Sequence, residues 1–128
     1  MALPNPYLQY QQQQVYTSPQ DKLLIMLYDG AIKFCHQAKR AMQNKQTEDA
    51  NVFIIKVEKI IEEFMATLDM NYEVAHKLYM LYEYMYRRLV EANTKKDPEI
   101  IDEVLDFLSD LRKTWAEVAV KAKKERMC

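Results

Sequence analysis

The sequence predicts an all-α protein, an antiparallel four-helix bundle with a flexible N-terminal arm. One glycine and four prolines in 128 residues are too few for the tight turns that many short strands require. Leu, Met, Ala, Glu, Lys and Gln, which favour helices, are abundant. Apolar residues recur at helical spacing in four long segments that short polar breaks separate. Because short links join long helices, consecutive helices are expected to pack antiparallel.

The chain divides into an arm over residues 1–17 and a bundle domain over residues 18–128. The arm contains two prolines, three tyrosines and the glutamine run Gln11 to Gln14, and little of it has a helical apolar stripe. Such a segment is expected to be disordered alone, or to dock only through its aromatic side chains.

The first two helices are predicted over residues 18–43 and 47–69. Ser18 is a suitable N-cap, Pro19 suits the first helical position, and Asp21 completes a spacing like that of a capping box. Thr47 is predicted to cap the second helix, whose first turn carries two carboxylates that favour the helix dipole. Apolar residues about 100° apart around each axis define the expected core. These are Leu23, Leu24, Leu27, Ala31, Phe34, Cys35, Ala38 and Met42 in the first helix, and Phe53, Ile54, Val57, Ile60, Ile61, Phe64 and Leu68 in the second.

The third and fourth helices are predicted over residues 71–93 and 97–124. Asn71 is expected to cap the third helix, and Asp97 to cap the fourth, which Pro98 opens. The same spacing rule gives their core faces. These are Val74, Ala75, Leu78, Leu81, Tyr82, Met85 and Leu89 in the third helix, and Ile101, Val104, Leu105, Leu108, Leu111, Trp115, Ala119 and Ala122 in the fourth.

Apolar residues remain after these cores are assigned. Two sets are ordered along a helix: Ile25, Tyr28 and Ile32 in the first helix, and Tyr72, Tyr79, Tyr86 and Val90 in the third. Single apolar residues are ordinary on a protein surface, and Val52, Ile55 and Tyr84 also lie outside the stripes. Two ordered stripes are more typical of a binding face, such as an apolar groove that receives an amphipathic helix. The predicted partner-binding residues of the bundle are therefore Ile25, Tyr28, Ile32, Tyr79, Tyr86 and Val90.

Charge and hydropathy exclude several classes of protein. The net charge is −1 with both signs interspersed, whereas a nucleic-acid-binding protein usually shows a basic stripe. The apolar run Leu23 to Tyr28 is far too short to span a bilayer, and the first ten residues lack the basic and apolar regions of a signal peptide. We therefore expect a cytosolic protein without membrane insertion. Cys35 is expected to be a buried small hydrophobe and Cys128 a free thiol.

Sequence motifs for catalysis are absent, and no cofactor is expected. The chain has no glycine-rich phosphate loop and no Gly-x-Ser-x-Gly. Glu73 and His76 form the Glu-x-x-His spacing of di-iron bundles, but such sites need a second copy and inward-facing carboxylates. We therefore predict neither a metal site nor an enzyme. Arg87 and Arg88 are expected to be solvated or paired with Glu83 and Glu91 at helical spacing, or else to hold carboxylates of a partner.

Three motifs together carry a family resemblance: "NPYLQYQQ", "SPQDKLLIMLYDGAIKF" and "YEYMYRRLVEAN". In this order, along essentially the whole chain, they resemble the flagellar secretion chaperone family FliS, the flagellin-specific export chaperones. The resemblance implies a cytosolic, non-enzymatic helical bundle. Its client would be the disordered C-terminal segment of flagellin, which it keeps from premature polymerisation and presents to the flagellar type III export gate.

The resemblance also carries over to particular residues. Tyr7 and Tyr10 match the family's aromatic arm, which is associated with covering or completing the client site. Tyr28, Asp29 and Gly30 match the motif of the first helix. The motif of the third helix is matched by Tyr86, Arg87, Arg88, Glu91 and Asn93.

The residues themselves leave two alternatives open. The apolar stripes would also suit an obligate homo-oligomer, such as a homodimer, that acts as an interaction or scaffold protein. The Glu-x-x-His spacing leaves a carboxylate-bundle metalloprotein as the weaker alternative. Light scattering separates the homo-oligomer from the chaperone, and metal analysis of the purified protein tests the metalloprotein.

Overall fold

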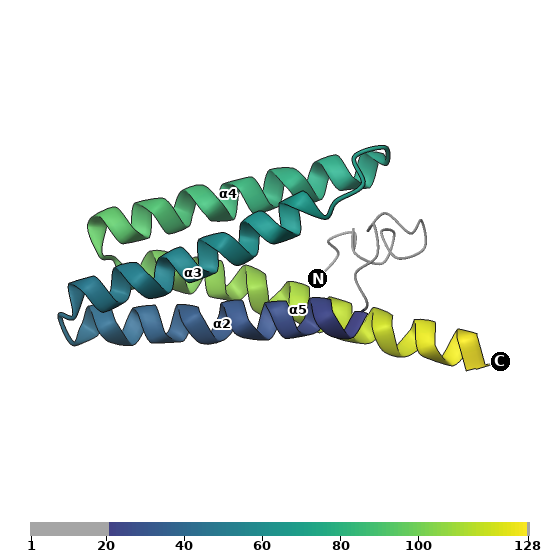
Figure 1. Ribbon diagram of the computed structural model, residues 1–128, viewed down its shortest axis with the longest axis horizontal. Helices are drawn as coiled ribbons and strands as arrows, with labels where there is room; N and C mark the ends of the chain where they lie inside the picture. Colours follow the sequence, from purple (N-terminus) through teal and green to yellow (C-terminus); the bar gives the residue numbers. More distant parts are fainter. Residues whose placement is uncertain (1–20, 128) are drawn as a thin grey trace.

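The computed structural model describes the backbone of residues 21–127 and the side chains of residues 22–117. Over this range the chain forms four helices, α2 (Asp21–Gln43), α3 (Thr47–Ala66), α4 (Glu73–Lys95) and α5 (Pro98–Met127) (Figure 1). The predicted all-α four-helix bundle is confirmed. The predictions for the arm, including Tyr7 and Tyr10, for the helix start at Ser18 and Pro19, and for Cys128 lie outside the described residues.

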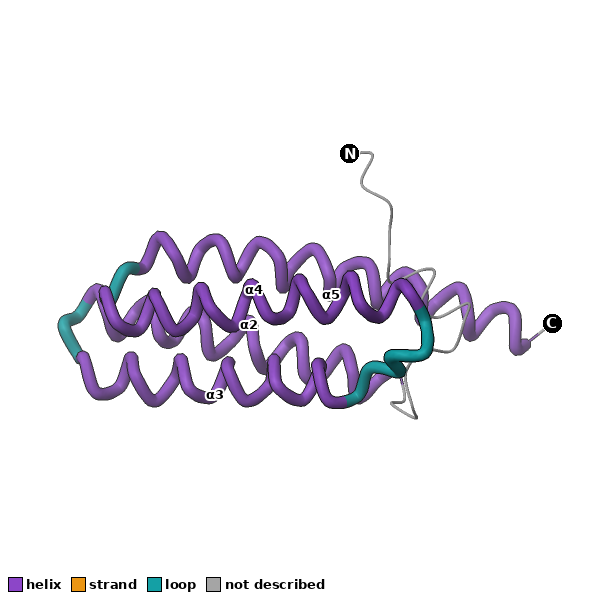
Figure 2. Tube along the Cα trace, turned by 90° about the horizontal axis from the view of Figure 1, so that it is seen from above, coloured by secondary structure: helices purple, strands orange, loops and turns teal. Residues whose placement is uncertain are grey.

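The helices form a four-sided bundle. α2 packs against α3 and α5, and α4 also packs against α3 and α5, so α2 and α4 are diagonal to each other. Consecutive helices run antiparallel and are joined by short loops at the two ends of the bundle (Figures 1 and 2). The last turns of α5 extend beyond the ends of the other three helices (Figure 1). No helix within residues 21–127 is long and apolar enough to cross a membrane.

Of the predicted caps of α3, α4 and α5, only that of α5 is confirmed. Asp97 caps α5, where its Oδ1 accepts a hydrogen bond of 2.9 Å from the amide of Glu99. Thr47 is the first helical residue of α3 and not its cap, because Gln46 occupies the N-cap position. Lys45, with a φ of 58°, lies in the turn before it. Asn71 does not cap α4 either. Its backbone amide donates a hydrogen bond to Asp69 Oδ1 within the loop between α3 and α4. This loop starts after Ala66, three residues earlier than predicted, and Tyr72 is the N-cap residue of α4.

The predicted core is confirmed wherever the structure describes side chains, with one exception. Leu24, Ala31, Cys35 and the core residues of α3, α4 and α5 are buried or pack against the buried cluster. Leu23, predicted as core, is 52% exposed, because the buried stripe of α2 starts at Leu24 and Leu23 lies about 100° round the helix from it. The side chains of Ala119 and Ala122 lie outside the described residues.

Three aromatic rings occupy the centre of the core and contradict one prediction. Tyr28, predicted to face a partner, is completely buried. Its ring stacks on Phe64 at 4.4 Å between centroids, and Phe64 stacks on Tyr82 at 5.3 Å. The hydroxyl groups of Tyr28 and Tyr82 are hydrogen-bonded at 2.7 Å. Because this bond satisfies polar groups that would otherwise oppose burial, Tyr28 can lie in the core, and its assignment to the surface was wrong.

Cys35 behaves as predicted for a buried small hydrophobe. Its side chain is completely buried in the core cluster, and burial raises the pKa of the thiol to about 12. The charged thiolate is disfavoured in such an apolar environment.

Candidate partner-binding surface

Tyr79, Tyr86 and Val90 lie on the flank of α4 that faces α3. Two hydrogen bonds mark this flank: the Tyr86 hydroxyl donates to Glu62 Oε1 at 3.0 Å, and Asn93 Nδ2 donates to Asn51 Oδ1 at 2.6 Å. Tyr79 precedes Tyr86 by seven residues and Val90 follows it by four, so helical geometry places all three on this side of α4.

The residues of this flank remain partly open to solvent. Tyr79 and Tyr86 are half-buried and pack on the edge of the core, while Val90 is 45% exposed. Ile55 of α3 is also exposed. It lies in sequence between Asn51 and Glu62, and Val90 of α4 lies between their hydrogen-bond partners, Asn93 and Tyr86. Ile55 and Val90 are therefore at a similar level along the bundle. Tyr79, Tyr86, Val90 and Ile55, together with Glu58 and Glu62, form what we call the α3–α4 surface.

Ile25 and Ile32 lie on the flank of α2 that faces α5. The Asp29 carboxylate pairs with Arg112 Nε of α5 at 2.9 Å, and Lys39 Nζ pairs with Asp102 Oδ1 at 2.6 Å. Ile25 and Ile32 stand four residues before and three residues after Asp29, hence on the same flank. Both are half-buried and pack against the core. These two isoleucines and the two ion pairs form what we call the α2–α5 surface.

The two surfaces lie on opposite sides of the bundle. Since α2 and α4 are diagonal, the α2–α5 side and the α3–α4 side share no helix (Figure 2). The structure therefore brings Tyr79, Tyr86 and Val90 together, and separately Ile25 and Ile32, but it does not join the two sets into one site.

The α3–α4 surface carries carboxylates that the sequence analysis did not include. Glu58 and Glu62 are four residues apart on α3, and the pKa of Glu58 is raised, first by burial and then by the charge of Glu62. The pKa of Tyr86 is raised mainly because its hydroxyl donates to Glu62. The i, i+4 spacing of these glutamates beside Ile55 was the only signal in the sequence.

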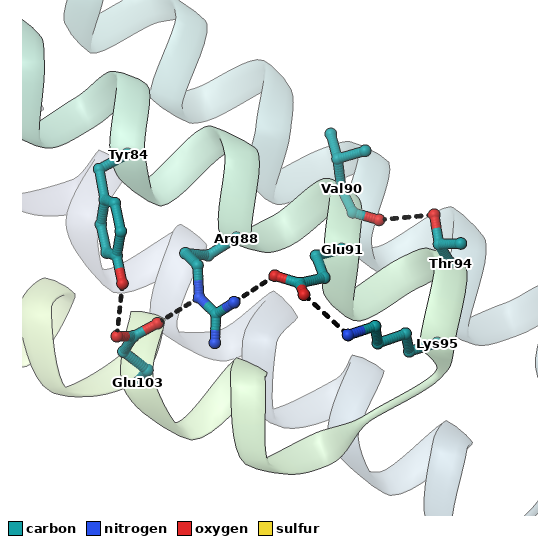
Figure 3. A network of polar contacts seen from close by, with 7 residues as sticks. All are labelled: Tyr84, Arg88, Val90, Glu91, Thr94, Lys95 and Glu103. Carbon is teal, nitrogen blue, oxygen red and sulfur yellow. Dashed lines mark hydrogen bonds and ion pairs between the residues drawn. The ribbon is translucent and has the colours of Figure 1, made fainter.

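The other flank of α4 faces α5 and carries a polar network (Figure 3). Arg88 Nε donates to Glu103 Oε1 at 2.6 Å, and Tyr84 donates to the other oxygen of Glu103 at 2.8 Å. Glu91 accepts hydrogen bonds from Arg88 and from Lys95. The pKa of Glu103 is lowered, mainly by the hydrogen bond from Arg88, and that of Glu91 mainly by the bond from Lys95.

This network shows which of the expected roles each arginine takes: Arg88 is paired and Arg87 is exposed. Arg88, not Arg87, pairs with Glu91, because Arg88 is turned toward α5 while Arg87 points to solvent. Arg87 forms no ion pair with a described side chain; its guanidinium carbon lies 5.9 Å from the Tyr84 ring centroid. Arg88 therefore has a structural role between α4 and α5.

The histidines contribute to no metal site that the structure describes. Over the described side chains, no group of three or more His, Cys, Asp or Glu residues could hold a metal ion. His76 is exposed, and its Nε2 is hydrogen-bonded to the carbonyl oxygen of Met70 at 2.9 Å.

Comparisons with known proteins agree with this architecture. The model of the family described as "Flagellar protein FliS" matches residues 3–122. The chain is 40% identical over 126 residues to the flagellar secretion chaperone FliS of Bacillus subtilis, covering 98% of this chain and 95% of the relative. It is 35% identical over 114 residues to FliS of Campylobacter jejuni, covering 88% and 89%. Because these relatives are chaperones and the match spans nearly the whole chain, the protein belongs to the FliS family of flagellar secretion chaperones, and it is not an enzyme.

Proposed function

We propose that this protein is a cytosolic chaperone that binds the disordered C-terminal segment of flagellin, prevents its premature polymerisation and delivers it to the flagellar type III export apparatus. The single observation that carries the proposal is the apolar surface left over once the core is complete. Val90, Ile55 and the half-buried Tyr79 and Tyr86 on one side, and Ile25 and Ile32 on the other, remain available to another chain.

The chemistry of such a client fits this surface. A segment that polymerises through apolar helix faces must keep those faces covered while it waits for export. A disordered chain loses conformational entropy when it binds, so it needs a large contact area to reach a useful affinity. Tyrosine supplies much contact area with few rotatable bonds, which suits the exposed edges of Tyr79 and Tyr86.

The placement of the two surfaces supports a wrapped client. A single helix cannot contact the α2–α5 surface and the α3–α4 surface together, because they lie on opposite sides of the bundle. We propose that the client passes around the bundle and uses both. Tyr7 and Tyr10 of the arm remain part of the proposal as residues that cover or complete the client site.

Titration calorimetry with the full-length protein tests the proposal. The probe is the C-terminal segment of flagellin from the same organism, and a peptide of scrambled sequence is the control. Saturable binding with a negative heat capacity change is expected, because apolar surface is buried. Ile32→Glu and Val90→Glu, one on each surface, should each weaken binding. No binding of the C-terminal segment by the wild-type protein would refute the proposal.

A second copy of the chain is the competing occupant of these surfaces. Light scattering on the isolated protein distinguishes the two. We expect either a monomer or a dimer that dissociates when the flagellin segment is added. A stable, salt-insensitive dimer that takes up no flagellin segment would instead support a homo-oligomeric scaffold.

A further inference from the structure

We infer that the α3–α4 surface binds a part of the client that carries a lysine or arginine next to its apolar side chains, and that Glu58 and Glu62 receive this cation. This inference rests on the proposed function, since it concerns the same surface and the same client. It adds the chemical class of the segment that binds there and, with it, a direction for the bound chain.

The first observation is the distribution of ion pairs. Among the described side chains, every ion pair between two helices links α5 to α2 or to α4: Asp29 with Arg112, Lys39 with Asp102, and Arg88 with Glu103. The contacts across α3 and α4 are instead hydrogen bonds, from Tyr86 to Glu62 and from Asn93 to Asn51. Within this range of side chains, neither Glu58 nor Glu62 has a cationic partner.

The second observation is the orientation of the nearest cations. Lys56, two residues before Glu58, has its Nζ 5.1 Å from the Phe34 ring centroid and 5.8 Å from that of Phe53, so it lies toward α2. Arg87, next to Tyr86 in sequence, lies over the ring of Tyr84, which faces α5. Both side chains are directed away from the α3–α4 surface. Lys59 is exposed, and it forms no ion pair with any side chain of residues 22–117.

The negative charge of Glu58 is therefore poorly compensated in the free protein. Glu58 is half-buried and stands one helical turn from a like charge, and both conditions disfavour its ionised form. Glu62 accepts one hydrogen bond, from the Tyr86 hydroxyl, although a carboxylate has about four acceptor positions. An ammonium or guanidinium group from a partner would fill these positions and neutralise the pair.

On the α2–α5 surface, the carboxylate of Asp29 has a cationic partner among the described residues, unlike Glu58 and Glu62. On the α2–α5 surface, Asp29 and Lys39 already have partners on α5, so Ile25 and Ile32 offer apolar contact beside neutralised charges. If one part of the client carries a cation, that part would be attracted to the α3–α4 surface. Such complementarity selects orientation and accelerates association more than it adds affinity.

The test compares wild-type protein with the Glu58→Gln, Glu62→Gln double variant. Glutamine keeps the shape and can still accept the Tyr86 hydrogen bond, and circular dichroism verifies the fold. The flagellin C-terminal segment is titrated at about 0.05 M and about 0.5 M salt, which respectively preserve and screen surface electrostatics. We expect the double variant to bind about three- to tenfold more weakly at low salt and to show less salt dependence than the wild type.

Asp106 and Asp110 provide a matched control. They are exposed, four residues apart on α5, and neither pairs with a cation among the side chains that the structure describes. The Asp106→Asn, Asp110→Asn variant makes the same change in net charge and should bind like the wild type. A general charge effect would shift both variants equally and would overturn the inference.

Substitutions in the client complete the test. Replacing the lysines and arginines of the flagellin segment one at a time with glutamine should identify one position that weakens binding to the wild type and has little effect on the double variant. If the double variant binds like the wild type at both salt concentrations, the inference fails while flagellin binding stands. If the wild type binds no flagellin segment at either, the proposed function fails and the inference with it.

Discussion

Gly30→Ala is expected to stabilise the protein. Gly30, the only glycine of the chain, lies inside α2, and no glycine in the described residues has a positive φ. A Cβ atom at this position would meet Ile60 Cδ1 at 3.7 Å, an ordinary van der Waals contact. Alanine also restricts the unfolded chain and favours helix, so the free energy of unfolding should rise by about 0.5–1 kcal/mol. For a domain of this size the melting temperature should rise by about 2–4 °C.

Urea unfolding followed by circular dichroism measures this change. Lys33, exposed in the same helix, supplies two controls. Lys33→Ala should change stability by less than about 0.4 kcal/mol, and Lys33→Gly should lower it by about 1 kcal/mol. If Gly30→Ala proves less stable than the wild type, the contact between α2 and α3 is tighter than the 3.7 Å separation indicates. The reasoning that assigns room to the methyl group would then be refuted.

Three further predictions concern the flanks of α4 and the buried thiol. Tyr86→Glu places a third carboxylate beside Glu58 and Glu62, and it should abolish flagellin binding in calorimetry while unfolding stays cooperative. The control Tyr84→Glu makes the same change on the flank of α4 that faces α5 and should leave binding intact. If the Tyr86→Glu protein is unfolded, Tyr86 belongs to the core. In a Cys128→Ser background, Cys35 should react with a thiol reagent at about pH 8 only as fast as the protein opens, since its pKa is about 12; rapid reaction of the folded protein would contradict this. The pKa values of Glu91 and Glu103 are lowered in the folded protein. The stability that these two carboxylates provide is therefore present above their ordinary pKa and is lost as the pH falls through the lowered values. Arg88→Met should accordingly reduce the free energy of unfolding less below about pH 4 than at neutral pH, as measured by acid unfolding.

The motif of the first helix illustrates how far sequence reasoning extends. The resemblance marks Tyr28, Asp29 and Gly30 without separating residues that bind a client from residues that build the fold. The structure places Tyr28 in the core, pairs Asp29 with Arg112, and packs Gly30 close to Ile60. Tyr28 is therefore part of the buried core of the bundle.

The candidate site was predicted in part for a similar reason. The spacing of Tyr79, Tyr86 and Val90 identified one flank of the third helix, and they do share a flank. Which neighbouring helix that flank faces cannot be read from α4 alone, because this depends on how the helix is rotated in the bundle. The carboxylates of Glu58 and Glu62 complete this surface from another helix, so no pattern within one segment joins them to Tyr86.

The sequence by itself determined the four helices and nearly all of their buried faces, because helix formation and apolar periodicity depend on residues a few positions apart. The tertiary structure alone decided that the two leftover stripes lie on opposite sides, and that Tyr28 is buried. The hydroxyl that makes its burial favourable belongs to Tyr82, 54 residues away, and only the packing of α2 and α4 into one core brings the two together.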